Sequence, residues 1–374
     1  NSIAYVDIGP IITTNQDSGK LSRLYSNRQG LKYTKLFEPL PRPKVRRFIE
    51  AAEMEQRVNI VISILKDHPE QVETLFVADE PYLDGIPKAE LERVGNYLRK
   101  KLNEANLDHI QLGLIFSSGM FNSDYATMVD REAGEYTLAI DNYYDRASNS
   151  TNPAEREQAE FVRRNRLTTY DKAGNFTTEG GLPQGYGVVG FDFYISTLLH
   201  DTVHNRALDW LSQNTPEPSC KAFKGKTIPE LRQQLSFFRD GGMDRNDNRP
   251  SDRALLDQMF NCRMNGLTQL LKTQAAGSKV KLLMISESSN NGLLEFDSKG
   301  NVEAQQPAQL VEERVLDEVK RALTFYQNNK ADLQAGLMFF TFENEFDPTI
   351  NLSIGGASSM PSVMDEIYRF VKSE

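Results

Sequence analysis

The chain has 374 residues, of which 39% are hydrophobic and 25% are charged, so it is neither a disordered chain nor a low-complexity fibre. Its 52 acidic residues outnumber its 43 basic residues, and this net charge of −9, without a basic run, argues against nucleic acid as a ligand. No apolar run approaches the ~18 residues that a helix needs to cross a bilayer, so we expect no membrane span.

Six nearly continuous apolar runs are the strongest structural signal in the chain. Runs of this kind are typical of strands that are buried on both faces of a parallel sheet. They span residues 3–8, 74–78, 110–116, 188–193, 280–285 and 335–342, and weaker strand candidates span 33–37, 58–64 and 136–140.

Helix-like segments separate these runs. They span residues 44–56, 88–105, 154–164, 204–213, 228–238, 253–273, 309–328 and 361–372. Several begin near a proline, which is a common first residue of a helix. This alternation predicts βαβ units around a parallel sheet.

The number of strands suggests a closed barrel. Six firm strands and two of the weaker candidates would supply the eight strands of a (β/α)₈ TIM barrel. We therefore predict an α/β fold with one barrel domain over residues 1–374 and long rim insertions near 142–187 and 214–253.

The numbering of the barrel strands depends on the weak candidates. If 58–64 is a strand and 136–140 is not, 74–78 is the fourth strand and 280–285 is the seventh. If the reverse holds, 74–78 is the third strand.

The chain start and two cysteines bear on the compartment. The sequence begins at Asn1 without a methionine, so we expect that N-terminal sequence has been removed, by signal-peptide cleavage, cloning or proteolysis. Cys220 and Cys262 could form one disulfide, which would suit a secreted or periplasmic protein, or they could be two unrelated buried thiols.

Carboxylates recur where the predicted strands end, which is where barrel enzymes carry their catalytic groups. The acids concerned are Asp7, Asp79, Glu80, Asp192, Glu287 and Glu343. A single acid at such a position often only caps the following helix. Here aromatic residues accompany the acids, namely Tyr82, Phe193, Tyr194 and Phe346. Acids interleaved with aromatic rings favour a carbohydrate ligand, whose C–H faces stack on rings while its hydroxyls bind carboxylates.

Three short segments give the chain a resemblance to glycoside-hydrolase-type (β/α)₈ barrels. The segment 75–82, Leu-Phe-Val-Ala-Asp-Glu-Pro-Tyr, is similar to the Asp-Glu-Pro segment that ends a central strand in several of them. The segment 190–194 resembles their G-x-D-x-Y strand end, and Glu287 stands where many carry a nucleophilic glutamate. One position departs from the pattern, because many retaining members have Asn-Glu where this chain has Asp79-Glu80.

The resemblance implies hydrolysis of a poly- or oligosaccharide without a cofactor. This reaction needs two carboxyl groups, one on each side of the scissile bond. We assign Glu80 as the general acid/base and Glu287 as the nucleophile. Adjacent strand residues point to opposite faces, so if Asp79 is the one that points into the cleft, the acid role passes to Asp79. The candidates for substrate binding are Asp79, Tyr82, Asp192, Tyr194 and Glu343, with Asp141 a further candidate if 136–140 is a strand.

Two rival functions remain open. A catalytically silent barrel could bind a glycan or a protein, because fold does not imply function. His200 and His204 are four residues apart, as in a two-histidine zinc site, which would suit a metal-dependent hydrolase, but no downstream third ligand is evident. Only four histidines occur in the chain, which favours carboxylate chemistry and a site without metal.

Overall fold

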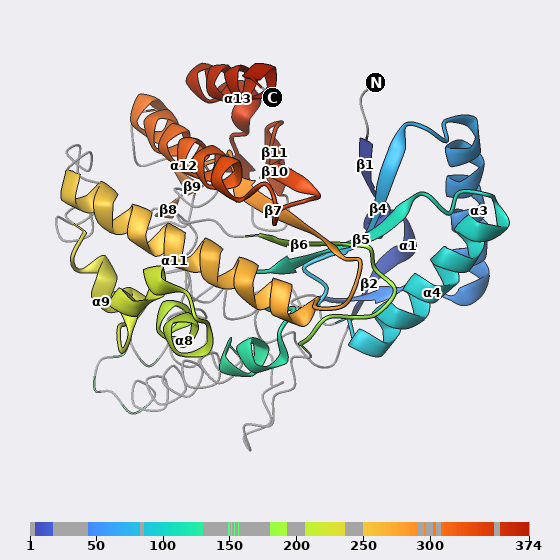
Figure 1. The fold of residues 1–374 in the computed structure, drawn as a ribbon, viewed down its shortest axis with the longest axis horizontal. Helices are drawn as coiled ribbons and strands as arrows, with labels where there is room; N and C mark the ends of the chain where they lie inside the picture. Colours follow the sequence, from blue (N-terminus) through green and yellow to red (C-terminus); the bar gives the residue numbers. More distant parts are fainter. Residues whose placement is uncertain are drawn as a thin grey trace.

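A parallel sheet of six strands forms the centre of the protein (Figure 1). The computed structural model describes residues 4–17, 44–82, 86–129, 149, 151, 153, 156, 180–192, 206–235, 250–290, 295–296, 302–303, 308–347 and 352–373. The strands are, in order across the sheet, β1 (Ala4–Asp7), β4 (Val72–Asp79), β5 (Gln111–Ser117), β6 (Val188–Asp192), β7 (Lys281–Glu287) and β10 (Gly336–Phe340). Among the strands of this sheet, each therefore lies next to the one that precedes it in the sequence, as in a singly wound barrel.

Helices connect and cover the strands. The longer ones are α3 (Ala51–Asp67), α4 (Lys88–Glu104), α8 (Ala207–Asn214), α11 (Pro250–Gln274), α12 (Ala308–Asn329) and α13 (Pro361–Ser373). Short helical turns are α1 (Gly9–Ile12), η1 (Pro218–Phe223), α9 (Ile228–Arg232) and η3 (Ala357–Ser359). None of the described helices is long and apolar enough to cross a membrane.

Among the described residues, three antiparallel strand pairs lie outside the central sheet. They join β2 (Thr13–Asp17) to β3 (Lys44–Phe48), β8 (Glu295–Phe296) to β9 (Val302–Glu303), and β11 (Glu345–Asp347) to β12 (Leu352–Ile354). The β11–β12 pair follows β10, so it belongs to the carboxyl-end side of the sheet.

All six strands that the apolar runs predicted are confirmed, but the weak candidate 58–64 is wrong. That segment lies inside α3, where Val58 is buried while Ile60 and Ile64 are more than half exposed. Met54, Val58 and Leu65 form the buried side of α3, at helical and not at strand spacing. The predicted helix 44–56 is also wrong over its first residues, which form β3. The candidates 33–37 and 136–140 lie outside the described residues.

The sheet is curled, because side chains from strands that are not neighbours meet on one face. Glu73 of β4 and Lys281 of β7 form a 3.0 Å ion pair, although β5 and β6 separate their strands. The Tyr5 hydroxyl of β1 donates a 2.6 Å hydrogen bond to the carbonyl of Ala335, which precedes β10. The two edges of the sheet therefore approach each other, and we call the enclosed side the concave face.

Apolar side chains from all six strands fill the concave face. They are Tyr5, Phe76, Ile115, Val188, Leu283, Ile285, Ala335, Met338 and Phe340. Gly190 gives this cluster room, since a Cβ there would lie 2.6 Å from the Cδ1 of Ile285. The part of the chain that the structure describes thus contributes six strands of a barrel-like sheet with a packed interior, where a complete (β/α)₈ barrel has eight.

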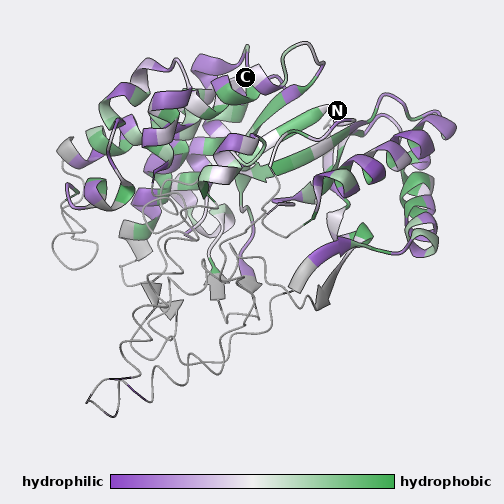
Figure 2. Ribbon diagram, turned by 90° about the horizontal axis from the view of Figure 1, so that it is seen from below, coloured by the Kyte–Doolittle hydropathy of each residue, from purple (hydrophilic) through white to green (hydrophobic). Residues whose placement is uncertain are grey.

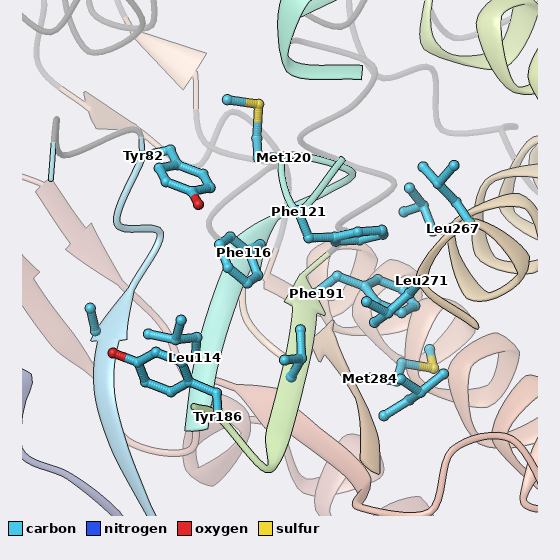
Figure 3. Close-up of a cluster of buried hydrophobic side chains, with 14 of the residues drawn as sticks. Tyr82, Leu114, Phe116, Met120, Phe121, Tyr186, Phe191, Leu267, Leu271 and Met284 are labelled. Atoms are coloured by element: carbon cyan, nitrogen blue, oxygen red, sulfur yellow. The ribbon is translucent and has the colours of Figure 1, made fainter. Parts of the chain in front are cut away.

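The opposite, convex face packs against the helices. Figure 3 shows side chains of this large cluster, including Leu114 and Phe116 of β5, Phe191 of β6 and Leu271 of α11. In Figure 2 the strands of the sheet are largely hydrophobic, whereas the helices around them carry many hydrophilic residues. The concave and convex clusters explain why the strands read as continuous apolar runs: both of their faces are buried.

A disulfide joins η1 to α11. Cys220 and Cys262 are bonded at 2.12 Å, with 4.6 Å between their Cα atoms, and both are fully buried. Of the two alternatives that the sequence left open, the disulfide is confirmed.

The hydrogen bond between the sheet edges can be tested by Tyr5→Phe. This change removes only the hydroxyl that donates to Ala335, so we expect the free energy of unfolding to fall by about 1 kcal/mol. Urea unfolding measures the change. Tyr368→Phe is the matched control, because Tyr368 is 57% exposed and its replacement should change the free energy of unfolding by less than ~0.5 kcal/mol. Equal effects of the two changes would contradict the edge contact.

Candidate functional site

Carboxylates line the carboxyl-terminal edge of the sheet on its concave side. Asp79, the last residue of β4, is in register with Ile115, and Asp192, the last residue of β6, is in register with Ile285. Ile115 and Ile285 both belong to the concave cluster. Since residues in register on parallel strands point to the same face, the strand ends direct Asp79 and Asp192 to the concave side.

Glu80 and Asp192 form a hydrogen-bonded pair of carboxyl groups. They come from the ends of β4 and β6, so their contact crosses the end of β5. Asp192 is 9% exposed, whereas Glu80 is only partly buried and Asp79 is exposed. Burial, followed by the charges of Glu80 and Asp79, raises the pKa of Asp192 well above its usual range, and a hydrogen bond from Ser118 opposes this rise. The pair therefore retains a proton at a pH where an isolated carboxyl group has lost it.

The residues that directly follow β4 and β5 both have the left-handed backbone conformation. One is Glu80, a member of the carboxyl pair, and the other is Ser118, which binds Asp192. Glu80 has φ +44°, and its amide donates a 2.9 Å hydrogen bond to the carbonyl of Ile115. Ser118 has φ +50°, and its amide donates to the carbonyl of Asp192 at 3.0 Å and to its Oδ1 at 3.2 Å. Non-glycine residues adopt this conformation at a cost, and such positions concentrate at functional sites. Successive residues of a regular strand point to opposite faces, so Glu80 would be expected to point away from the side that Asp79 faces. The left-handed conformation of Glu80 interrupts this alternation and lets its side chain reach Asp192.

Glu287 lies in a second pair of carboxyl groups, with Glu318 of α12. Glu287 is 1% exposed, and Ser288 and Ser289 beside it are fully buried. Burial, followed by the charge and the hydrogen bond of Glu287, raises the pKa of Glu318 well above its usual range, while Arg321 and Arg314 lower it. This pair therefore also retains a proton at a pH where an isolated carboxyl group has lost it. The two carboxyl groups that the sequence assigned to catalysis, Glu80 and Glu287, thus have different partners.

Two of the remaining predicted site residues, Tyr82 and Glu343, are described by the structure, and they lie apart in different environments. Tyr82 is 3% exposed and packs on Phe116 in the convex cluster, with its hydroxyl donating a 2.6 Å hydrogen bond to the carbonyl of Gly181. Glu343 follows β10, is exposed, and accepts a 3.3 Å hydrogen bond from Ser358. Tyr194, Asp141, His200 and His204 lie outside the described residues. Within the described ranges, no group of three or more His, Cys, Asp or Glu side chains could hold a metal ion.

Sequence reasoning missed Glu318, a member of the second carboxyl pair, and also Ser118 and Arg263, which lie behind the first pair. Arg263 and Glu318 did carry a signal, because each is a charged residue on the buried stripe of a helix. Arg263 stands between Met259 and Leu267, one turn away on either side, and all three are buried. Ser118 carried no signal, since its role depends on a backbone conformation.

The raised carboxyl pKa values predict how stability depends on pH. A carboxyl group whose pKa is higher in the folded protein contributes stability that is fully present below the unfolded value, about pH 4, and is lost as the pH rises through the folded value. Asp192 and Glu318 should both contribute in this way. The free energy of unfolding of the wild type should therefore fall between pH 4 and neutral pH. In Asp192→Asn and Glu318→Gln this fall should be smaller, and urea unfolding at the two pH values measures it. Equal slopes for the wild type and both variants would contradict the assignment.

Comparisons with known proteins give little further identification. No family model matches the chain, and no curated protein matches it. Among solved structures, the chain is similar to a family 1 β-glucosidase from Thermotoga maritima, with 9% identity, a TM-score of 0.26, and 99% of this chain and 97% of that chain covered. A β-glucosidase from Thermotoga maritima in complex with cyclophellitol matches over the same shares, with 9% identity and a TM-score of 0.25. Similarity at this level carries no conclusion about function, so the assignment to the α/β class rests on the curled parallel sheet itself.

Proposed function

We propose that the protein is a glycoside hydrolase that acts on a poly- or oligosaccharide at the carboxyl-terminal edge of a single (β/α)₈ barrel domain. The observation that carries the proposal is the hydrogen-bonded pair of Glu80 and Asp192 at this edge. Glycoside hydrolysis needs a carboxyl group that is still protonated at the working pH, and a pair that retains a proton supplies one.

In the proposed reaction Glu80 is the group that transfers the proton. Glu80 is the more exposed member of the pair, so it can reach the glycosidic oxygen, while the buried Asp192 stores the proton behind it. As the bond to the leaving group breaks, the one proton of the pair passes from Asp192 to Glu80 and from Glu80 to the glycosidic oxygen. Asp79, Tyr194 and Glu343 are proposed to contact the sugar, and Tyr82 to hold the segment after β4 in place through Gly181.

Glu287 is the proposed nucleophile. Its pair with Glu318 retains one proton between the two carboxyl groups. In the proposed reacting form Glu318 carries this proton, which leaves Glu287 ionised for attack on the anomeric carbon. The disulfide between Cys220 and Cys262 supports action in an oxidising compartment, as in a secreted or periplasmic protein.

A specific observation favours the second candidate, a glycan-binding barrel without catalysis. Glu287 is 1% exposed, whereas a nucleophile must touch its substrate. The more accessible acids, Asp79, Glu80 and Glu343, would then bind sugar hydroxyls without a reaction.

A substrate panel separates the two functions. Aryl glycosides of several sugars and both anomers, together with unmodified oligosaccharides, are incubated with the protein, and the anomer of the first product is read by proton NMR. Cleavage with retention supports Glu287 as nucleophile, because retention requires a covalent intermediate. Inversion would make Glu287 the base that activates water. Binding by calorimetry without cleavage of any member would replace hydrolysis by the glycan-binding function.

A further inference from the structure

Arg263 is a fully buried charge that lies behind the carboxyl pair. It belongs to α11, is 1% exposed, and is among the largest fully buried side chains of the described residues. Its Nε donates a 3.1 Å hydrogen bond to the Oγ of Ser118, and its Nη2 contacts the same oxygen. Its guanidinium also lies 5.5 Å from the centre of the Tyr125 ring. Burying a guanidinium is costly unless polar groups bind it, so the contacts with Ser118 and Tyr125 offset part of the cost of burying Arg263.

Ser118 connects Arg263 to Asp192. Its Oγ accepts hydrogen bonds from the guanidinium, so its own proton is directed to the hydroxyl of Tyr125, 3.0 Å away. Its backbone amide donates to both the carbonyl and the Oδ1 of Asp192. Arg263 therefore holds the side chain of Ser118, and the main chain of Ser118 in turn holds Asp192.

The conformation of Ser118 shows why it needs a buried anchor. Its φ of +50° lies in the left-handed region, which a serine adopts only when its surroundings enforce it. In this conformation the amide points at Asp192. The contacts from Arg263 and Tyr125 hold the side chain, and through it the direction of the amide.

We propose that Arg263 is a positioning residue, which acts through Ser118 to hold the carboxyl group of Asp192 against Glu80. For its catalytic part this inference rests on the proposed glycoside hydrolysis, whereas its geometric part does not need a substrate. Among the described residues, the charged groups that act on Asp192 are Glu80 and Asp79 at the end of β4.

The test uses two variants. Arg263→Met removes the guanidinium. Ser118→Ala removes the hydroxyl that binds the guanidinium and keeps the backbone amide that binds Asp192. The titration of Asp192 is followed by carbon NMR of labelled aspartate and assigned with Asp192→Asn. Because the Ser118 amide lowers the pKa of Asp192, both variants should move this titration to higher pH. On a cleaved glycoside kcat should fall on the order of 100-fold with little change in KM, and Arg263→Lys should retain part of the activity.

Arg253→Met is the matched control, because Arg253 lies on the same helix and pairs with Asp317 at 2.9 Å. It should leave the titration of Asp192 unchanged. If Arg263→Met does not fold, Ser118→Ala decides. An unchanged titration of Asp192 in a folded Ser118→Ala or Arg263→Met protein overturns the proposal, whatever the activity. A shifted titration in a protein that cleaves no glycoside supports the positioning role and rejects the proposed function alone.

Discussion

Replacing Glu80 with glutamine should lower the turnover of a cleaved glycoside by about 10³-fold, since general acid catalysis by a positioned side chain contributes 10²- to 10⁴-fold. Glutamine keeps the shape of the side chain and removes its proton. Glycan binding and folding should therefore change little. Substrates whose leaving group needs no protonation should lose much less activity than unmodified oligosaccharides, because their bond cleavage does not depend on an acid.

The variant Glu73→Gln is the matched control for Glu80→Gln. Glu73 is a glutamate on the same strand, β4, but it lies near the opposite end, where it pairs with Lys281. Its replacement should leave turnover within a few-fold of the wild type. Asp192→Asn should keep part of the activity and move the alkaline decrease of turnover to lower pH, because the stored proton is lost. If Glu80→Gln and Glu73→Gln have equal activity, Glu80 is not the acid.

Replacing both cysteines with serine should lower the free energy of unfolding by roughly 4 kcal/mol. The disulfide joins residues 42 positions apart, and closing a loop of this size in the unfolded chain accounts for a loss of that order. The effect should be large because Cys220 and Cys262 are both fully buried, so the serine hydroxyls would also lie in an apolar environment.

Urea unfolding of the double variant, of the oxidised wild type and of the reduced wild type tests this expectation. The reduced wild type is the control, since it lacks the bond but keeps the native side chains. It should unfold at a lower urea concentration than the oxidised wild type and at a higher one than the double variant, which also buries two serine hydroxyls. Coincident unfolding of oxidised and reduced wild type would show that the bond does not contribute to stability.

The sequence predicted the central sheet well, because burial on both faces leaves a direct trace in composition. Each of the six apolar runs forms a strand, in the expected order. The segment 58–64 misled for the same reason: its valines and isoleucines have the composition of a strand, while the spacing of Val58 and Leu65 with Met54 is that of a helix. In this segment composition indicated neither the type of element nor the burial, since Ile60 and Ile64 are more than half exposed.

The candidate site was predicted in its residue types and not in its contacts. Glu80, Asp192 and Glu287 were identified from their positions after apolar runs, which place them at strand ends. Their partners could not be read in the same way. The pairing of Glu287 with Glu318 joins a strand to the middle of a helix, and the hold of Ser118 on Asp192 depends on a positive φ. Both depend on three-dimensional geometry that no local pattern encodes.

The hydrogen bond between Tyr5 and Ala335 has a consequence for the order in which the protein can form during synthesis. The two residues are 330 positions apart, so β1 leaves the ribosome long before the partner of its tyrosine exists. Contacts of such long range form late, and they slow folding. Until the chain has been made as far as Ala335, about nine-tenths of its length, β1 has one partner strand in the described sheet, β4. A nascent chain that stops before β10 should therefore expose β1 to proteases and chaperones, even though β4, the strand that pairs with β1, has already been made.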